Sequence, residues 1–119
     1  MTADLHDGSL DGLVLTPEKA LEISFTTVPG DKVTLRLNGL VRLKAEDFRE
    51  GNTVLDVEIK RGESIERSTI AAAIGEKEDH PFVQKLCDQA RAEGWATVDV
   101  SSSYGCALIG VGKSVDILR

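Results

Sequence analysis

Apolar and polar residues alternate along much of this chain, and a period of two restricts such segments to β-strands with one buried face. Leu21, Ile23 and Phe25 alternate with polar residues. After Pro29-Gly30, apolar residues occupy most of the odd positions of 33–43. The Pro-Gly pair suits a type II turn, because proline sets φ and glycine supplies the positive φ. The two segments are therefore predicted to form an antiparallel hairpin.

Five further segments are expected to join this sheet or to border it. Val54 to Lys60 and Trp95 to Ser102 alternate, whereas Cys106 to Val111 is apolar on both faces, as a strand covered on both sides would be. Val115 to Leu118 is expected to form a last short strand. Residues 1–12 are mostly polar and are expected to form a loop or a short edge strand. Together these patterns predict an antiparallel sheet of about five to seven strands.

Polar positions of the predicted strands carry opposite charges. Arg36 and Arg42 lie at such positions in the hairpin, and Asp56 and Glu58 lie at such positions in the following strand. Opposite charges that face each other across strands contribute about 0.2–1 kcal/mol per pair. We therefore expect these residues to pair across neighbouring strands, which accounts for the basic residues without a nucleic-acid partner.

Residues 80–93 carry the clearest helical pattern. Asp79 or His80 can cap this helix, and Pro81 fits its first turn, where a missing N–H costs nothing. An apolar stripe recurs at three- and four-residue spacing and comprises Phe82, Val83, Leu86, Cys87 and Ala90. Gly94 supplies the C-terminal stop. The helix is expected to pack across the apolar face of the sheet, while the pattern of 64–73 leaves helix and strand open.

These elements predict one α+β domain over residues 1–119. Its antiparallel sheet has about five to seven strands, with one main amphipathic helix, about 80–93, packed on one face. A chain of 119 residues lies within the commonest domain size, about 100–150 residues. No internal repeat or low-complexity tract suggests a boundary within it.

The string Ala107 to Ser114 matches a loose phosphate-binding pattern, in which Gly-Lys-Ser follows a small residue and four others. A working loop of this kind leads into a helix whose N-terminal amides hold the phosphates. Only five residues follow Ser114, too few for a stable helix. We therefore predict that Gly110 to Lys113 forms a strand end and hairpin turn, and that the chain binds no nucleotide.

The charge of the chain narrows the classes of partner. Twenty acidic residues against fourteen basic ones give a formal net charge of −6. An acidic surface repels nucleic-acid phosphates and anionic membranes, and it suits a partner with a basic face. We therefore expect a protein partner or self-association, with a homo-oligomer as one form, and no nucleic acid or membrane.

The expected compartment is the cytoplasm. The N-terminal residues lack the basic and apolar regions of a signal peptide, and no apolar run reaches the roughly 18–20 residues needed to span a bilayer. Cys87 and Cys106 do not form a CxxC motif, and both are expected to be reduced and buried.

Few residues offer recognisable site chemistry. His6 and Asp7 are adjacent, and a carboxylate can orient an imidazole; the alternative is that the pair anchors the N-terminal segment. Ser101 to Cys106 lacks the Gly-x-Ser-x-Gly pattern of a nucleophile elbow, and its serines can equally satisfy backbone groups at a turn. The candidate ligand-binding residues are His6, Asp7, Ser103, Tyr104 and Cys106. We predict no catalytic set, no metal site and no cofactor.

Two short motifs carry a resemblance. Leu5-His6-Asp7-Gly8 near the start and Ser103-Tyr104-Gly105 near the end resemble those of short bacterial α+β domains, some of which look like toxin-immunity proteins. No activity is attached to that group, so the resemblance implies a bacterial cytosolic accessory domain and says nothing about a reaction.

Two functions remain open at this point. The first is a small non-catalytic binding or interaction domain that acts through an acidic face. The alternative is a small-ligand-binding protein or weak enzyme, with a pocket near His6, Asp7, Tyr104 and Cys106. The alternative requires side chains that lie about a hundred positions apart in the sequence to converge in the fold.

Overall fold

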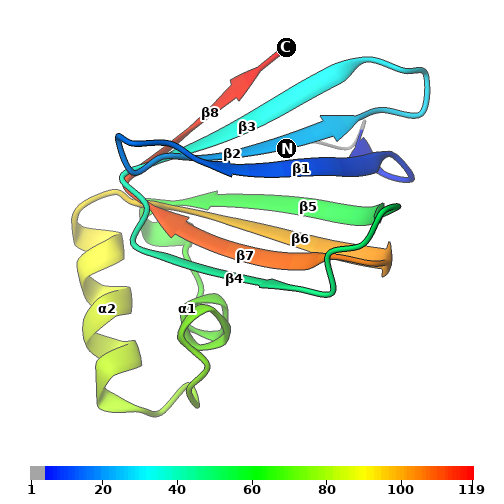
Figure 1. Cartoon of the computed structure of the whole chain (residues 1–119). Coiled ribbons are helices and arrows are strands. Elements are labelled where there is room, and N and C mark those ends of the chain that lie inside the picture. The colour runs from blue at the N-terminus through cyan, green and yellow to red at the C-terminus, as the bar shows by residue number, and fades with distance from the viewer. Residues whose placement is uncertain (1–4) are drawn as a thin grey trace.

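A computed structural model describes residues 5–119, which form an α+β domain with eight strands and two α-helices (Figure 1). The elements are β1 (Ser9–Leu15), β2 (Leu21–Thr26), β3 (Lys32–Asn38), β4 (Arg42–Glu46), β5 (Thr53–Arg61), η2 (Gly62–Ser64, a 3₁₀ turn), α1 (Arg67–Ile74), α2 (Pro81–Ala92), β6 (Ala96–Tyr104), β7 (Ala107–Gly112) and β8 (Ser114–Leu118). The expected number of strands, about five to seven, is therefore too low. The difference arises because 9–15 forms a full strand and because 33–44 divides into two.

All neighbouring strands are antiparallel, in the order β4-β7-β6-β5-β1-β2-β3-β8. The join between β5 and β1 is a single pair, Ser9 with Thr53. Here the sheet separates into two layers, β4-β7-β6-β5 and β1-β2-β3-β8, which face each other in Figure 1.

The main hydrophobic core fills the space between the two layers. It is built from aliphatic side chains of both, with Phe25 as its one aromatic member, and includes Leu10, Leu21, Ile23, Leu35, Leu37, Val57, Val98, Val100, Leu108 and Val115. Burying a side chain of this kind stabilises the fold by about 1.5–3 kcal/mol. The apolar face of each layer is therefore covered by the other layer.

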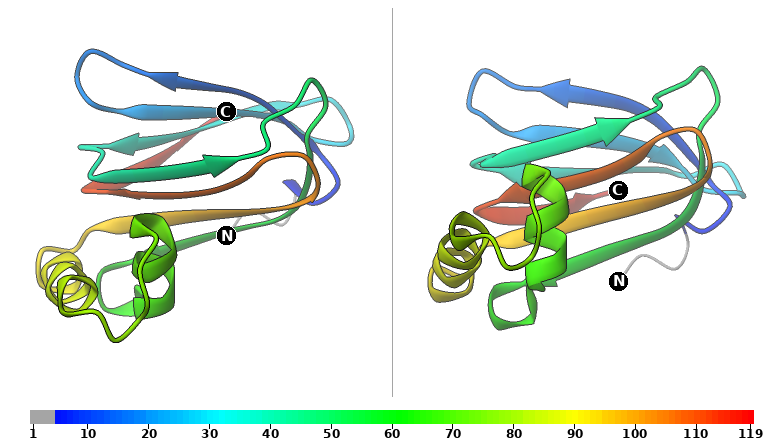
Figure 2. Two further views of the ribbon diagram at one scale, coloured as in Figure 1. Left: turned by 60° about the horizontal axis from the view of Figure 1, so that its bottom comes forward. Right: turned by 90° about the horizontal axis from the view of Figure 1, so that it is seen from below.

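The helices lie on the outer face of the β4-β7-β6-β5 layer, at one end (Figures 1 and 2). Helix α1 contacts β4 and β7, while α2 packs mainly against α1 and η2. A second core joins both helices to the sheet and comprises Ile65, Ile70, Ala71, Ala73, Val83, Leu86, Cys87, Ala90, Trp95 and Val111. The expectation that the 80–93 helix packs across the apolar face of the sheet is therefore wrong, because the second layer already occupies that face.

The ends of both helices follow from local chemistry. The His80 ring nitrogen Nδ1 accepts a hydrogen bond from the Phe82 N–H at 3.1 Å, and Pro81 opens α2 as expected. The ambiguous 64–73 stretch becomes η2 and α1, and Gly75, with φ of 75°, ends α1 in the left-handed conformation that favours glycine. Within residues 5–119, neither helix has the length and apolar character needed to cross a bilayer.

The predicted hairpin forms, but its second strand ends early. Strands β2 and β3 pair in register, with Ile23 opposite Leu35. Gly39, with φ of 57°, then turns the chain, and β4 leaves to pair with β7 in the other layer. The alternation of residues 33–44 has a single exception, Leu40, which directly follows Gly39, and the alternation on both sides of it predicts one strand.

The break separates the two arginines that were expected to pair with Asp56 and Glu58. The Arg36 Nε lies 3.7 Å from the Glu22 carboxylate in the β1-β2-β3-β8 layer. The Arg42 guanidinium lies 6.0 Å from the centre of the Phe82 ring. The expected pairing is therefore wrong, because β5 neighbours β6 and β1 rather than β3 or β4.

The apparent phosphate-binding string lies where the chain passes from one layer to the other. Strand β7 pairs with β4 and β6, whereas β8 pairs with β3, so the expected hairpin turn between them is wrong. At the junction the Lys113 N–H donates to the Asn38 carbonyl at 2.7 Å. Ser114 begins a strand, so the string lacks the helix N-terminus that holds phosphates.

The glycines of the string permit a close approach between β7 and β3. A Cβ atom at Gly110 would lie 2.7 Å from the Leu37 Cδ2. At Gly112 it would lie 2.7 Å from both the Asn38 carbonyl oxygen and the Leu37 Cγ. The Asn38 backbone cannot move aside easily, so Gly112 is required by packing, whereas at Gly110 the end of the Leu37 side chain would have to shift.

We predict that Gly112→Ala lowers the free energy of unfolding by about 1–3 kcal/mol, because the added methyl group overpacks the junction. Urea unfolding followed by circular dichroism measures this change. Gly12→Ala in β1 is the matched control, since an added Cβ there meets nothing within 4 Å. The control is expected to stay within about 0.5 kcal/mol of the parent. Equal losses for the two variants would contradict the packing role of Gly112.

Candidate functional site

The five residues expected to form a ligand site lie at the same end of the layered sheet, around the start of β5. They are His6, Asp7, Ser103, Tyr104 and Cys106. The Asp7 N–H donates to the Val54 carbonyl at 2.9 Å, and Tyr104 pairs with Thr53 in the ladder. The Ser103 hydroxyl lies 3.5 Å from the Thr53 carbonyl oxygen. The fold therefore brings together residues that are about a hundred positions apart.

The side chains of this group have separate partners. The His6 Nδ1 bonds to the Leu55 carbonyl oxygen at 2.5 Å, and its Nε2 lies 3.5 Å from the Asp7 carboxylate. The Arg49 guanidinium lies over the Tyr104 ring, with its Cζ atom 5.5 Å from the centre of the ring. These contacts anchor the N-terminal segment and the β6–β7 turn.

Cys106 is buried, and its neighbour Asn52 organises the turn. Burial raises the pKa of the Cys106 thiol, so the thiol stays protonated at neutral pH and is a weak nucleophile. The Asn52 Oδ1 accepts from the Cys106 and Arg49 N–H groups at 2.9 Å, and its Nδ2 donates to the Leu10 and Arg49 carbonyls. All four hydrogen-bonding positions of this buried amide are therefore occupied.

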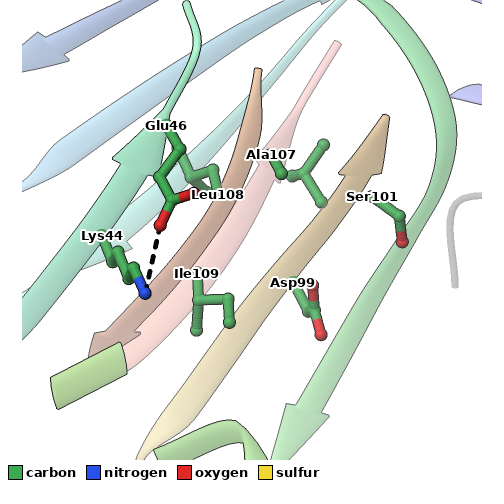
Figure 3. A pocket seen from close by; sticks show the side chains of 8 residues that line it. Lys44, Glu46, Asp99, Ser101, Ala107, Leu108 and Ile109 are labelled. Atoms are coloured by element: carbon green, nitrogen blue, oxygen red, sulfur yellow. Dashed lines mark ion pairs between the residues drawn. The ribbon is translucent and has the colours of Figure 1, made fainter. Parts of the chain in front are cut away.

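A hollow opens elsewhere, on the outer face of the β4-β7-β6-β5 layer (Figure 3). Its volume is about 230 Å³, and it is lined by Lys44, Glu46, Asp99, Val100, Ser101, Ala107, Leu108 and Ile109. The ladder explains the arrangement: Lys44 and Asp99 each pair with Ile109, from opposite sides. Figure 3 shows the Ile109 side chain between the other two.

The helices cover only part of this outer face. Two ladder positions further along, on the same face, Val111 and Thr97 are almost fully buried in the part of the layer that carries the helices. Ile109 remains half-buried, and Ala107 and Ser101 are exposed. The hollow is thus the uncovered part of a sheet face, with an apolar floor beside α1.

Three carboxylates lie in the hollow or next to it, and the nearby Lys60 interacts with the charge of only one of them, Glu58. Glu58 lies opposite Asp99 across β5 and β6, and Asp56 lies opposite Ser101. In the part of the chain that the structure describes, none of these three has a basic partner within 4 Å, whereas Lys44 pairs with Glu46 at 3.1 Å. The layer therefore carries excess negative charge at this place.

The environment of Asp99 reflects this excess. Burial removes water from its carboxyl group and raises its pKa above the ordinary value. The negative charges of Glu58 and Asp56, and then that of Glu66, raise this pKa further. When Asp99 is ionised, its negative charge is therefore not fully balanced by positive groups of the chain.

This arrangement suits a cationic side chain with an apolar stem. Carboxylates accept charge-assisted hydrogen bonds from guanidinium and ammonium groups, and lysine and arginine stems pack on apolar surface. The lining contains no histidine or cysteine. Across residues 5–119, no three His, Cys, Asp or Glu side chains form a group that could hold a metal ion.

Asp99 is not among the site residues predicted from the sequence. It lies at a polar position of an alternating segment, as Asp56 and Glu58 do, so their outward direction can be inferred. Their proximity follows only from the pairing of β5 with β6 across the helical region. A sequence-based prediction that β5 pairs with β6 would therefore have been enough to place these carboxylates next to one another.

Comparisons with known proteins do not assign the chain to a family. No protein-family model matches the chain, and no curated protein is significantly similar to it. The resemblance to short bacterial α+β domains therefore stays a prediction. Any function has to be argued from the fold and from the residues described above.

We predict that Asp99→Asn raises the free energy of unfolding at pH 7, by at most about 1 kcal/mol. The physical reason is that the variant removes a carboxylate disfavoured by burial and by like charges. Because the folded chain holds the Asp99 proton more tightly than the unfolded chain, stability falls as pH rises from the ordinary aspartate pKa of about 3.9 through the raised value. The advantage of the variant should therefore vanish at lower pH.

Urea unfolding at a series of pH values measures this difference. Asp31→Asn, at an exposed position in the β2–β3 turn, is the matched control and should show no such pH-dependent gain. An equal gain in both variants would show that net charge, rather than the surroundings of Asp99, sets the effect.

Proposed function

We propose that this chain is a non-catalytic interaction domain that binds a basic segment of a partner protein in the acidic hollow. The observation that carries the proposal is the half-buried Asp99, which faces Glu58 beside the apolar floor at Ile109. A guanidinium or ammonium group placed here would neutralise the carboxylates, and its stem would cover Ile109.

The overall charge supports the same conclusion. A net charge of −6 attracts basic partners at long range and accelerates their encounter. Local contacts at the hollow would then select the segment. Because part of this binding is electrostatic, its affinity should fall as salt rises and shortens the screening length, which is about 8 Å at physiological ionic strength.

The alternative function, a small-ligand protein or weak enzyme near His6, Asp7, Tyr104 and Cys106, stays a prediction. Its residues share one end of the sheet, which it requires. The described contacts, however, are those expected of a structural role, with His6 bonded to a backbone carbonyl and Cys106 buried and protonated. We therefore favour the hollow.

We predict that a fluorescein-labelled peptide of alternating arginine and threonine binds the chain and that the Glu58→Gln/Asp99→Asn double variant binds it at least about fivefold more weakly. The loss is expected because both removed charges border the hollow. Fluorescence anisotropy at low and physiological salt measures the affinities, and thermal unfolding verifies that each variant folds.

The matched control is the Glu18→Gln/Asp31→Asn double variant. It changes the net charge by the same amount at exposed turns on either side of β2, outside the lining of the hollow. Its affinity should stay within about twofold of the parent. Equal losses in both double variants, or no binding by the parent, would contradict the proposal.

A further inference from the structure

The two edges of the sheet differ in how they are protected. Strand β4 forms one edge, carries charges at alternate positions (Arg42, Lys44 and Glu46), and has α1 packed beside it. Charged side chains and a covering helix are the usual means by which a protein blocks an exposed edge from pairing with another strand.

Strand β8 forms the other edge and is less protected. Across residues 5–119 its only ladder partner is β3, so one side of its backbone has no strand beside it. Asp116 is its single charged residue, while Ile117 and Leu118 are 37% and 46% exposed. An exposed apolar edge of this kind is a template for strand addition.

We propose that β8 pairs antiparallel with β8 of a second copy, so that the two sheets join edge to edge in a twofold-symmetric dimer. Such an interface is self-complementary, because the same strand of each copy forms both sides of it and every contact away from the dyad occurs twice. It also needs no element other than the strand that is already exposed.

Side-chain chemistry selects the register of this pairing. With Ile117 at the dyad, Ile117 faces its own copy and Asp116 faces Leu118 of the second copy. With Asp116 at the dyad, two carboxylates would face each other, which destabilises a strand pair. The register centred on Ile117 is therefore the expected one.

The effect of salt distinguishes this interface from binding in the proposed hollow. Two copies with a charge of −6 repel each other, and salt screens that repulsion. Dimerisation through β8 should therefore strengthen as salt rises, whereas binding of a basic segment in the hollow should weaken. The hollow is lined by residues of β4, β6 and β7, so either proposal can fail without the other.

Sedimentation velocity over a concentration series at low and high salt tests the dimer. The parent should show a concentration-dependent dimer that salt strengthens, and Ile117→Lys should weaken it at least about tenfold by placing two ammonium groups at the dyad. Val28→Lys is the matched control, since Val28 is 69% exposed at the β2–β3 turn. This control should dimerise like the parent.

Cysteine cross-linking tests the register without relying on a destabilising change. Ile117→Cys should form a disulfide-linked dimer when oxidised glutathione is added, because side chains facing each other across antiparallel strands are close enough to bridge. Val28→Cys should remain unlinked, and native Cys87 and Cys106 are buried. A parent that stays monomeric, a dimer that salt or Val28→Lys weakens, or equal cross-linking at both positions would overturn the proposal.

Discussion

The close approach of β7 to β3 at Gly110 and Gly112 is the contact on which the rest of the architecture depends. Without side chains at these positions, the β7 backbone can lie against Leu37. The hydrogen bond from Lys113 to Asn38 then directs the chain into β8. One continuous segment thereby serves both layers, and the apolar faces of those layers can meet.

This layered arrangement determines which surface is available for binding. Because each apolar face is covered by the opposite layer, the helices pack on an outer face instead. They cover Val111 and Thr97 but leave Ile109 half-buried, with Asp99 beside it. The acidic hollow is thus a consequence of two short helices covering only part of a four-stranded layer. Its chemistry follows from the polar positions of β5 and β6.

Much of the local structure could be predicted from the sequence, because it depends on neighbouring residues. The β2–β3 hairpin follows from alternation around Pro29-Gly30, and the start of α2 follows from His80 and Pro81. The layer break could not be predicted in this way. After the single exception at Leu40 the alternation resumes in the same phase, so the pattern of 33–43 predicts one strand where the structure has two.

In the candidate site, too, local features could be predicted from the sequence and contacts between distant segments could not. The outward direction of Asp99 could be inferred from its strand, but its proximity to Glu58 depends on pairing between strands separated by both helices. Conversely, the approach of His6 to the start of β5 confirms that distant segments meet there. Its bond to the Leu55 carbonyl shows why composition alone could not distinguish an anchoring contact from a ligand site.

The most direct test of whether the acidic hollow is the binding surface is an NMR titration. Amide spectra of the ¹⁵N-labelled chain would be followed as the arginine–threonine peptide is added. If the peptide binds in the hollow, the shifts will concentrate at the amides of Lys44, Asp99, Ser101 and Ile109, and the amides of His6 and Tyr104 will not shift. Shifts centred on His6 and Tyr104, or spread evenly over all acidic residues, would contradict it.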